Sequence, residues 1–236
     1  MHFFSALALA ATATAAAIPD AVLDKRTTTC TTAGSATLAA AKAAFTQAKL
    51  VPGVIPSFNP KVSVQVDYNG KQVNLGNTFS ATETLNQPID ITFTAKPGYD
   101  AASTKYTIIM VDPDAPGPAA PILKDILHLI IDDAQPVCTA NQNRKTIATY
   151  AQTTPLSVAA HRYTFLVYRQ PPNYVPPPTL MYLPGNRAKF DLNAYVAQAG
   201  LIGPVGGNFF REGLGSTVCA VTPGCTQDGT GYKAPS

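Results

Sequence analysis

The sequence predicts a mainly β protein with one folded domain of ordinary size. Residues 62–66 and 88–94 alternate apolar with polar side chains, a pattern typical of half-buried strands. Residues 106–111, 126–131 and 163–168 form nearly continuous apolar runs of strand length. Such runs are typical of strands in the middle of a sheet that is covered on both faces. The 16 glycines and 21 prolines indicate many loops, but too little low-complexity sequence for a disordered chain.

Two helices are expected at the periphery. Apolar residues recur every three or four positions over residues 35–50 and again over residues 190–199, which predicts one helix in each segment. Pro52 and Gly53 end the first helix, and Gly200 ends the second.

Turn signals divide the strands. Asn69-Gly70 follows the first alternating stretch and predicts a two-residue hairpin, because both residues adopt positive φ readily. In the second stretch Ile89, Ile91 and Phe93 occupy the apolar positions, so all three are expected to point inward.

Residues 170–184 are rich in proline but also contain apolar side chains, which indicates a long surface loop and not a linker. Two roles are open for this loop. It covers a sheet edge, or it contacts a partner protein.

Charge excludes one class of partner. The net charge is only +3, and the 17 basic and 14 acidic residues are spread along the chain. A nucleic-acid binder normally shows a basic stripe or cluster, so no nucleic-acid partner is expected. Beyond the N-terminal segment no apolar run is long enough to predict a membrane span.

The N-terminal segment resembles a secretory leader. Residues 1–17 carry no charged side chain, are rich in alanine, and end in the small residues that signal peptidase cleavage favours. Lys25-Arg26 resembles a kexin-type processing site, the alternative being an ordinary exposed charged pair. We therefore predict a signal peptide over 1–17, a propeptide over 18–26, a folded domain over 27–214 and a C-terminal tail over 215–236. The mature protein is expected outside the cell.

The four cysteines follow the predicted leader, and four thiols in a secreted chain suggest two disulfides. Three pairings are possible. We favour Cys219–Cys225, which spans a Thr-Pro-Gly turn, with Cys30–Cys138 as the long bridge and 215–236 as a disulfide-pinned tail. A zinc site built from all four thiolates is the rival, but the spacing lacks a C-x2-C pair, so no metal is expected.

Histidines and aspartates mark the strand ends. His128 and His161 lie in or beside two of the apolar runs, and Asp112 and Asp114 follow a third. If these strands are neighbours, two imidazoles and two carboxylates converge, with Tyr163 on the same strand face as His161. Two imidazoles suit a small oxyanion such as phosphate, with the carboxylates orienting the ring N–H groups. The alternative is a pair of core histidines and an ordinary Asp/Pro turn.

The chain resembles the phosphatidylethanolamine-binding protein family, which includes Raf kinase inhibitor and carboxypeptidase inhibitor proteins, in three segments: YTIIMVDPDAPGP, ILHLIIDD and HRYTFLVYRQP. Weaker similarity runs through VPGVIPSFNPKVSVQV and KFDLNAYVAQAGLIGPVGGNFF, so the resemblance covers about residues 40 to 212. With its leader, the chain is similar to a secreted, fungal-type member. The resemblance implies a large antiparallel sheet packed with a smaller sheet and few peripheral helices.

The resemblance also implies a small pocket that binds phosphate-type anions and phospholipid head groups. Carried over by motif, the pocket residues are Asp112, Asp114, His128, His161 and Tyr163. Phe210 stands where many relatives have a tyrosine near the pocket mouth, so one hydroxyl donor is missing here.

Two other departures concern the pocket's surroundings. Thr153-Thr154-Pro155 replaces a Gly-Pro-Pro stretch of the family, and Leu127 stands where relatives often have a second histidine.

Catalysis is not expected. Ser157, His161 and Asp112 could form a triad, but no G-x-S-x-G elbow exists, and no cofactor motif was found. The sequence thus predicts a secreted, non-enzymatic binder of phospholipid head groups or phosphate-type anions. The alternative is a serine protease or carboxypeptidase inhibitor, or a regulatory protein, that acts on a protease or other partner through an outer loop.

Overall fold

The structure is a computed structural model of the chain, and it describes residues 32–99, 104–137, 143–178 and 187–214. The predicted signal peptide and propeptide, the C-terminal tail and all four cysteines (Cys30, Cys138, Cys219 and Cys225) lie outside these residues. In chain order the described elements are α1 (Ser35–Gln47), β1 (Val62–Tyr68), β2 (Lys71–Gln72), β3 (Asp90–Ala95), β4 (Tyr106–Asp112), β5 (Ile126–Ala134), β6 (Lys145–Ala148), β7 (His161–Arg169), α2 (Leu192–Gln198) and β8 (Ile202–Glu212).

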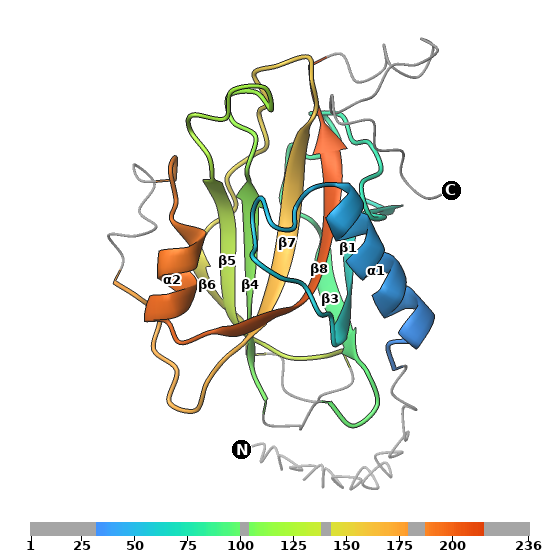
Figure 1. The fold of residues 1–236 in the computed structure, drawn as a ribbon, viewed down its shortest axis with the longest axis vertical. Helices are drawn as coiled ribbons and strands as arrows, with labels where there is room; N and C mark the ends of the chain where they lie inside the picture. The colour runs from blue at the N-terminus through green and yellow to red at the C-terminus, as the bar shows by residue number, and fades with distance from the viewer. Residues whose placement is uncertain (1–31, 100–103, 138–142, 179–186, 215–236) are drawn as a thin grey trace, which may run out of the picture.

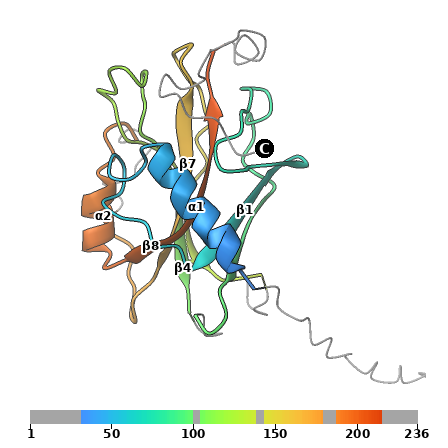
Figure 2. The same ribbon diagram turned by 45° about the vertical axis from the view of Figure 1, so that its right-hand side comes forward.

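The strands form two antiparallel sheets, as predicted. The smaller sheet has the order β2-β1-β3, and the larger has the order β6-β5-β4-β7-β8. Figure 1 shows the larger sheet in the middle of the molecule, with α2 at its left and α1 at its right. In the turned view of Figure 2, α1 runs diagonally across the strands.

Each face of the larger sheet packs on its own apolar cluster. Alternate residues of β4 divide between the two clusters because successive side chains of a strand point to opposite faces. Ile109 and Val111 pack with residues of α1 and α2. Ile108 and Met110 pack with residues of β1 and β3. The central strands are therefore covered on both sides, which is why they read as continuous apolar runs.

Most predicted elements occur near their expected bounds. The hairpin forms at Asn69-Gly70, where φ is 51° and 89° and Tyr68 pairs with Lys71. The second helix begins after Asp191, whose side chain accepts a hydrogen bond from the backbone N–H of Ala194 at 2.9 Å.

The prediction for Ile89 was wrong. Its side chain is 66% exposed, and β3 begins only at Asp90. The backbone N–H of Ile89 donates to the carbonyl of Asp67 on β1, so the residue lies just before the first residue of β3 that pairs with that strand.

Two strands of the larger sheet were not predicted, and β8 is the more important. Its eleven residues include Gly206 and Gly207, which interrupt the apolar alternation. A Cβ atom at Gly207 would lie 2.6 Å from Cζ of Phe45 and 2.9 Å from the carbonyl oxygen of Phe165. The glycine is thus needed for the close packing of α1 on β8. Because it interrupts the apolar/polar alternation, the strand was not predicted from the sequence.

Strand order brings the three motifs together. β4 pairs with β5 on one side and with β7 on the other, both antiparallel. The C-terminal end of β4, which leads into the Asp-Pro-Asp turn, therefore lies beside the N-terminal ends of β5 and β7. These three strand ends form the edge of the sheet on which the candidate site is built.

Candidate functional site

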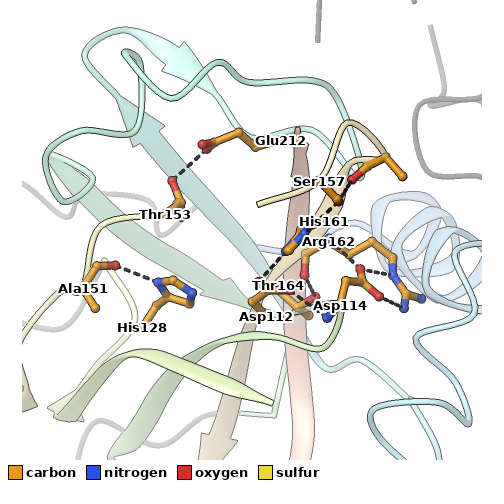
Figure 3. Close-up of polar contacts among 11 residues, drawn as sticks. Asp112, Asp114, His128, Ala151, Thr153, Ser157, His161, Arg162, Thr164 and Glu212 are labelled. Atoms are coloured by element: carbon orange, nitrogen blue, oxygen red, sulfur yellow. Dashed lines mark hydrogen bonds and ion pairs between the residues drawn. The ribbon is translucent and has the colours of Figure 1, made fainter. Parts of the chain in front are cut away.

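The six predicted site residues all lie at this edge, and all are buried. Their side chains belong to four adjacent strands and the turn after β4, and none exceeds 4% exposure (Asp112, Asp114, His128, His161, Tyr163 and Phe210). Figure 3 shows the two aspartates and the two histidines with their hydrogen-bond partners. Five of the six face one another, whereas the carboxylate of Asp114 is hydrogen-bonded to Arg162.

His161 forms a buried ion pair with Asp112. Its Nδ1 atom lies 2.8 Å from Oδ2 of Asp112, and its Nε2 atom lies 3.1 Å from Oγ of Ser157. Burial acts to lower the pKa of His161, but the hydrogen bond and charge of Asp112, with the charge of Asp114, outweigh it and raise that pKa above its ordinary value. The backbone N–H of Asp114 donates to Oδ1 of Asp112 at 2.8 Å and helps to fix the carboxylate.

The Ser157–His161–Asp112 chain has the connectivity of a catalytic triad, but its protons are placed differently. Oγ of Ser157 donates to the carbonyl oxygen of Ala159 at 2.5 Å. It therefore accepts the Nε2–H of His161, which is protonated on both nitrogens. A triad needs the reverse, an imidazole lone pair that accepts the serine proton. In this arrangement Ser157 is an acceptor for a charged ring, not an activated nucleophile.

His128 has the opposite electrostatic character. Its Nδ1 atom lies 2.7 Å from the carbonyl oxygen of Ala151, which can only accept a hydrogen bond, so Nδ1 carries the proton. Burial lowers the pKa of His128, and the hydrogen bond to Ala151 only partly opposes this. The ring is therefore neutral, and its Nε2 atom is buried without a hydrogen-bond partner among the described residues.

Tyr163 forms the aromatic wall between these histidines. Its ring stacks on Phe210 with centroids 5.1 Å apart, meets His128 edge-on at 5.2 Å, and lies parallel to His161 at 6.1 Å. Phe210, which the resemblance marked as lacking a hydroxyl, supports this wall with its ring.

Asp114 is a structural residue in this geometry. Its carboxylate accepts from the backbone N–H and Nε of Arg162, both at 2.8 Å, and from Nη2 at 2.5 Å. Nη1 of the same guanidinium donates to the carbonyl of Ala48, just after α1. The fork joins the Asp-Pro-Asp turn to β7 and to the helix, so Asp114 does not orient an imidazole as the sequence had suggested.

The structure adds a polar group that sequence reasoning missed. Glu212, at the end of β8, pairs directly opposite His161 in the ladder. Its Oε2 atom accepts hydrogen bonds from the hydroxyls of Thr84 and Thr153, each at 2.7 Å. The only sign of this Glu212–threonine cluster in the sequence was Thr153, which stands where the family has the glycine of its Gly-Pro-Pro stretch. The other departure, Leu127, lies on the opposite face of β5 in the cluster beneath the helices.

The Pro-rich loop lies at the other end of the larger sheet. Its described part, 170–178, is anchored where the hydroxyl of Tyr174 donates to Oδ2 of Asp132 at 2.8 Å, whereas Val175 is 73% exposed. A cavity of about 480 Å³ lies here, lined by Thr104, Lys105, Asp133, Arg169, Gln170, Pro171, Pro172, Asn173 and Tyr174. This loop and the predicted anion site are therefore separate surfaces.

Among the described residues, no group of three or more His, Cys, Asp or Glu side chains is arranged to hold a metal ion. Within the same residues, no helix has the length and apolar character that crossing a bilayer requires.

Comparison with known sequences gives one family. The model of the phosphatidylethanolamine-binding protein family matches residues 69–210. CEN-like protein 1 of Nicotiana tabacum is 34% identical over 165 residues, which is 70% of this chain and 88% of that protein. The 26 kDa secreted antigen of Toxocara canis is 35% identical over 172 residues, 71% of this chain and 62% of the antigen.

Solved structures show the same fold. The carboxypeptidase Y inhibitor, in complex with its cognate proteinase, superposes with a TM-score of 0.62 at 20% identity, over 75% of this chain and 96% of that one. A phosphatidylethanolamine-binding protein from Plasmodium vivax gives a TM-score of 0.57 at 20% identity, over 72% and 96% of the two chains. None of these four proteins is named for a catalytic activity.

Proposed function

Because the chain belongs to the phosphatidylethanolamine-binding protein family, we propose that it is a non-enzymatic binder of a small phosphate-type anion, such as a phospholipid head group or a related phosphate ester. One observation carries the proposal. The hydrogen bonds of His161 assign a proton to each of its ring nitrogens, so this buried imidazolium directs a charged N–H toward Ser157, a half-buried residue. A site that keeps a cation beneath the surface is suited to an anion.

Binding requires one exchange of hydrogen-bond partners. An oxygen of the anion replaces Oγ of Ser157 as the acceptor for Nε2–H of His161, while Asp112 keeps the ring charged and in place. Hydrogen bonds between charged partners are about twice as strong as neutral ones, so the exchange favours the ligand. Tyr163 walls the site on the side of β7.

The same geometry supports binding without turnover. The hydroxyl proton of Ser157 is given to a backbone carbonyl, and the imidazole beside it holds two protons. No general base is therefore available to this serine.

Calorimetric titration with phosphorylethanolamine tests the proposal through two matched variants. In His161→Asn and His128→Asn the amide N–H takes over the hydrogen bond of Nδ1, to Asp112 or to Ala151, and the Nε2 atom is removed. We expect His161→Asn to bind about ten- to a hundredfold more weakly, the loss of one charge-assisted bond. His128→Asn should weaken binding less, because Nε2 of His128 carries no proton to donate. Unchanged affinity in His161→Asn, or no binding by the wild type, would overturn the proposal.

Lys145→Gln is the control for loss of a positive charge. Lys145 is exposed and pairs with Asp133 on the distal end of β5, so its removal is expected to leave affinity unchanged. Thermal unfolding of each variant shows whether a loss of binding follows from a loss of folding.

A second candidate is inhibition of a peptidase, or regulation of another protein, through the Pro-rich loop. The exposure of Val175 beside Tyr174, whose hydroxyl is hydrogen-bonded to Asp132, favours it, because an exposed apolar side chain next to an anchored residue is suited to contact a partner. Val175→Asp is expected to weaken inhibition of a carboxypeptidase and to leave anion binding unchanged. Excess phosphorylethanolamine should block the binding of other phosphate-type anions and leave inhibition of the carboxypeptidase intact.

We also propose that the protein is secreted, as the uncharged Ala-rich N-terminus and the Lys25-Arg26 pair predict. N-terminal sequencing of protein from the culture medium is expected to begin at Thr27. A sequence beginning at Met1 or Ile18 would contradict the predicted processing.

A further inference from the structure

We infer that the end of the molecule around the anion site docks on a phospholipid bilayer, through exposed apolar side chains that surround Ser157. The inference rests on the proposed anion site and names the source of its ligand: a phosphate at the surface of a membrane, and not a free phosphate ester in solution. We call Ile122, Leu156 and Val158 the apolar rim.

The loop before β7 presents apolar side chains where a surface loop normally presents polar ones. Leu156 and Val158 are 72% and 73% exposed, whereas Thr153 is buried and Ser157 is half-buried. The loop is anchored, since the backbone N–H of Leu214 donates to the carbonyl of Ser157 at 2.9 Å. Two apolar side chains that an anchored loop holds in water stabilise no core, and such departures mark interaction surfaces.

The loop after β4 supplies the third member of the apolar rim. Ile122 is 72% exposed, and the next residue is fixed because the N–H of Leu123 donates to the carbonyl of Ala115 at 3.0 Å. The same loop packs on the serine: a Cβ atom at Gly117 would lie 3.3 Å from Cβ of Ser157. The apolar rim therefore comes from two loops that meet at Ser157.

Exposed apolar side chains are concentrated at this end of the molecule. Figures 1 and 2 both show the loop after β4, the loop before β7 and the end of β8 together at the top of the view. Five of the nine large hydrophobic residues that are exposed in the described part of the chain belong to these segments or follow Thr84, which binds Glu212 at the end of β8 (Leu85, Ile122, Leu156, Val158 and Leu214). The other end of the larger sheet carries Val175 and Ile202.

The charges around the apolar rim suit a phospholipid surface. Residues 149–160 contain no charged side chain. In the loop after β4 the carboxylate of Asp114 is buried in its ion pair, whereas Lys124 is exposed. Lys189 is also exposed, and its backbone N–H donates to the carbonyl of Leu123, beside the rim. Two exposed lysines next to loops without an exposed carboxylate match the negative surface potential of membranes that contain anionic lipids.

A bilayer surface supplies a partner for both the anion site and the apolar rim. In the proposed exchange a phosphate oxygen replaces Oγ of Ser157, which lies 3.1 Å from Nε2 of His161. Leu156 and Val158 are the chain neighbours of that serine. The phosphates of a bilayer lie between its hydrocarbon core and water. A lipid phosphate bound there therefore brings the rim to the border of the hydrocarbon, where apolar side chains leave water while the acyl chains stay in the membrane.

The chain contains no tryptophan, so one introduced tryptophan reports directly on contact with lipid. We expect Val158→Trp in the mature protein to show blue-shifted emission with vesicles of phosphatidylcholine, phosphatidylethanolamine and phosphatidylserine. Brominated lipids in the same vesicles should quench it. Val175→Trp is the matched control, because Val175 is equally exposed at the other end of the sheet, and it should show neither effect. No shift in Val158→Trp, or an equal shift in both variants, would overturn the inference.

Neutral substitutions test the contribution of the apolar rim to affinity. Leu156→Gln combined with Val158→Thr adds no charge beside His161. This double variant should bind the vesicles about tenfold more weakly or worse in co-sedimentation, because two side chains that leave water in the docked state become polar. Its affinity for soluble phosphorylethanolamine should equal that of the wild type. Val175→Thr combined with Ile202→Thr is the matched control and should bind vesicles as the wild type does.

The outcomes separate this inference from the proposed function. If the wild type does not bind phosphorylethanolamine, the anion site is wrong and the inference fails with it. If the wild type binds phosphorylethanolamine but not the vesicles, the anion site stands and docking on a bilayer is wrong. Equal vesicle binding by the wild type and the Leu156→Gln/Val158→Thr variant would also overturn the inference, and the apolar rim would then be a surface for a protein partner.

Discussion

His161 and Asp112 form an ion pair beneath the surface, with Nδ1 and Oδ2 2.8 Å apart and side chains only 2% and 3% exposed. The two residues are 49 positions apart in sequence and come from adjacent strands, β7 and β4. Removing one partner of a buried pair leaves the other charge uncompensated. Variants that leave one of these charges unpaired therefore report on folding as well as on the site.

Asp112→Asn should lower the pKa of His161. The amide keeps the shape of the carboxylate but removes its charge, so burial is no longer outweighed and the charged ring is disfavoured. NMR titration of the imidazole protons measures the change directly. Asp133→Asn, at the other end of β5, is the control and should leave the pKa of His161 in place. An unchanged pKa in Asp112→Asn would contradict the assigned ion pair.

The ion pair should also make stability depend on pH. The pKa of His161 in the folded chain lies above the unfolded value of about 6.5, so its contribution to stability is fully present below that pH. The contribution is lost as the pH rises through the folded-state pKa. Asp112→Asn should cost about 3–5 kcal/mol in mildly acidic solution, and the difference from wild type should shrink at higher pH. Urea unfolding over a pH series checks this, and a difference that grows with pH would refute it.

Arg162→Lys should destabilise the fold through Asp114. A lysine ammonium cannot reproduce the fork of Nε and Nη2 on the carboxylate, and it cannot at the same time reach the carbonyl of Ala48. We expect a loss of about 1–3 kcal/mol in the free energy of unfolding. Arg169→Lys, at the far end of the same strand, is the matched control. Equal stability of the two variants would show that the fork is dispensable.

Gly207→Ala should destabilise the packing of α1 on the larger sheet. The added Cβ would approach Cζ of Phe45 to 2.6 Å, so the ring or the strand must move. Overpacking of this kind costs about 1–3 kcal/mol. At Gly34, the N-cap of α1, the nearest atom to an added Cβ is Oγ1 of Thr37 at 3.8 Å, so Gly34→Ala should cost less. Chemical denaturation of both variants gives the comparison, and a smaller loss for Gly207→Ala would contradict the close approach.

The disulfides remain a prediction from sequence. Peptide mapping of the secreted protein without reduction should find Cys219 joined to Cys225 and Cys30 joined to Cys138. Each bridge should stabilise the fold by about 2–4 kcal/mol, with the short loop contributing less. Four free thiols would remove the prediction and weaken the proposal of secretion.

Local patterns predicted most of the fold. The alternation in β1 and the apolar runs of β4, β5 and β7 are properties of consecutive residues, so they can be read without knowledge of neighbours. Strand β8 could not be found in this way, because Gly206 and Gly207 are explained only by what packs against them. Ile89 shows the opposite error: it fits the two-residue alternation of a strand and was predicted to point inward, but it is exposed and precedes β3.

The site was predictable in its composition but not in its pairing. Motif positions indicated that two histidines and two aspartates lie at the ends of three strands. Which carboxylate serves which partner was not readable from spacing: Asp112 pairs with His161, whereas Asp114 pairs with Arg162. Asp112 ends β4 and Asp114 lies in the turn after it, so the direction of the chain in that turn determines which partner each carboxylate reaches.

The sequence by itself determined the fold class, the strands buried on both faces and the residues that stand at the ends of three of those strands, because these depend on periodicity and on motifs within short segments. Only the tertiary structure decided that Glu212 stands opposite His161 and that threonines from two other segments hold it. Strand pairing and register join residues from distant parts of the chain, so the charge and hydrogen-bonding character of the site arise from contacts that no local pattern contains.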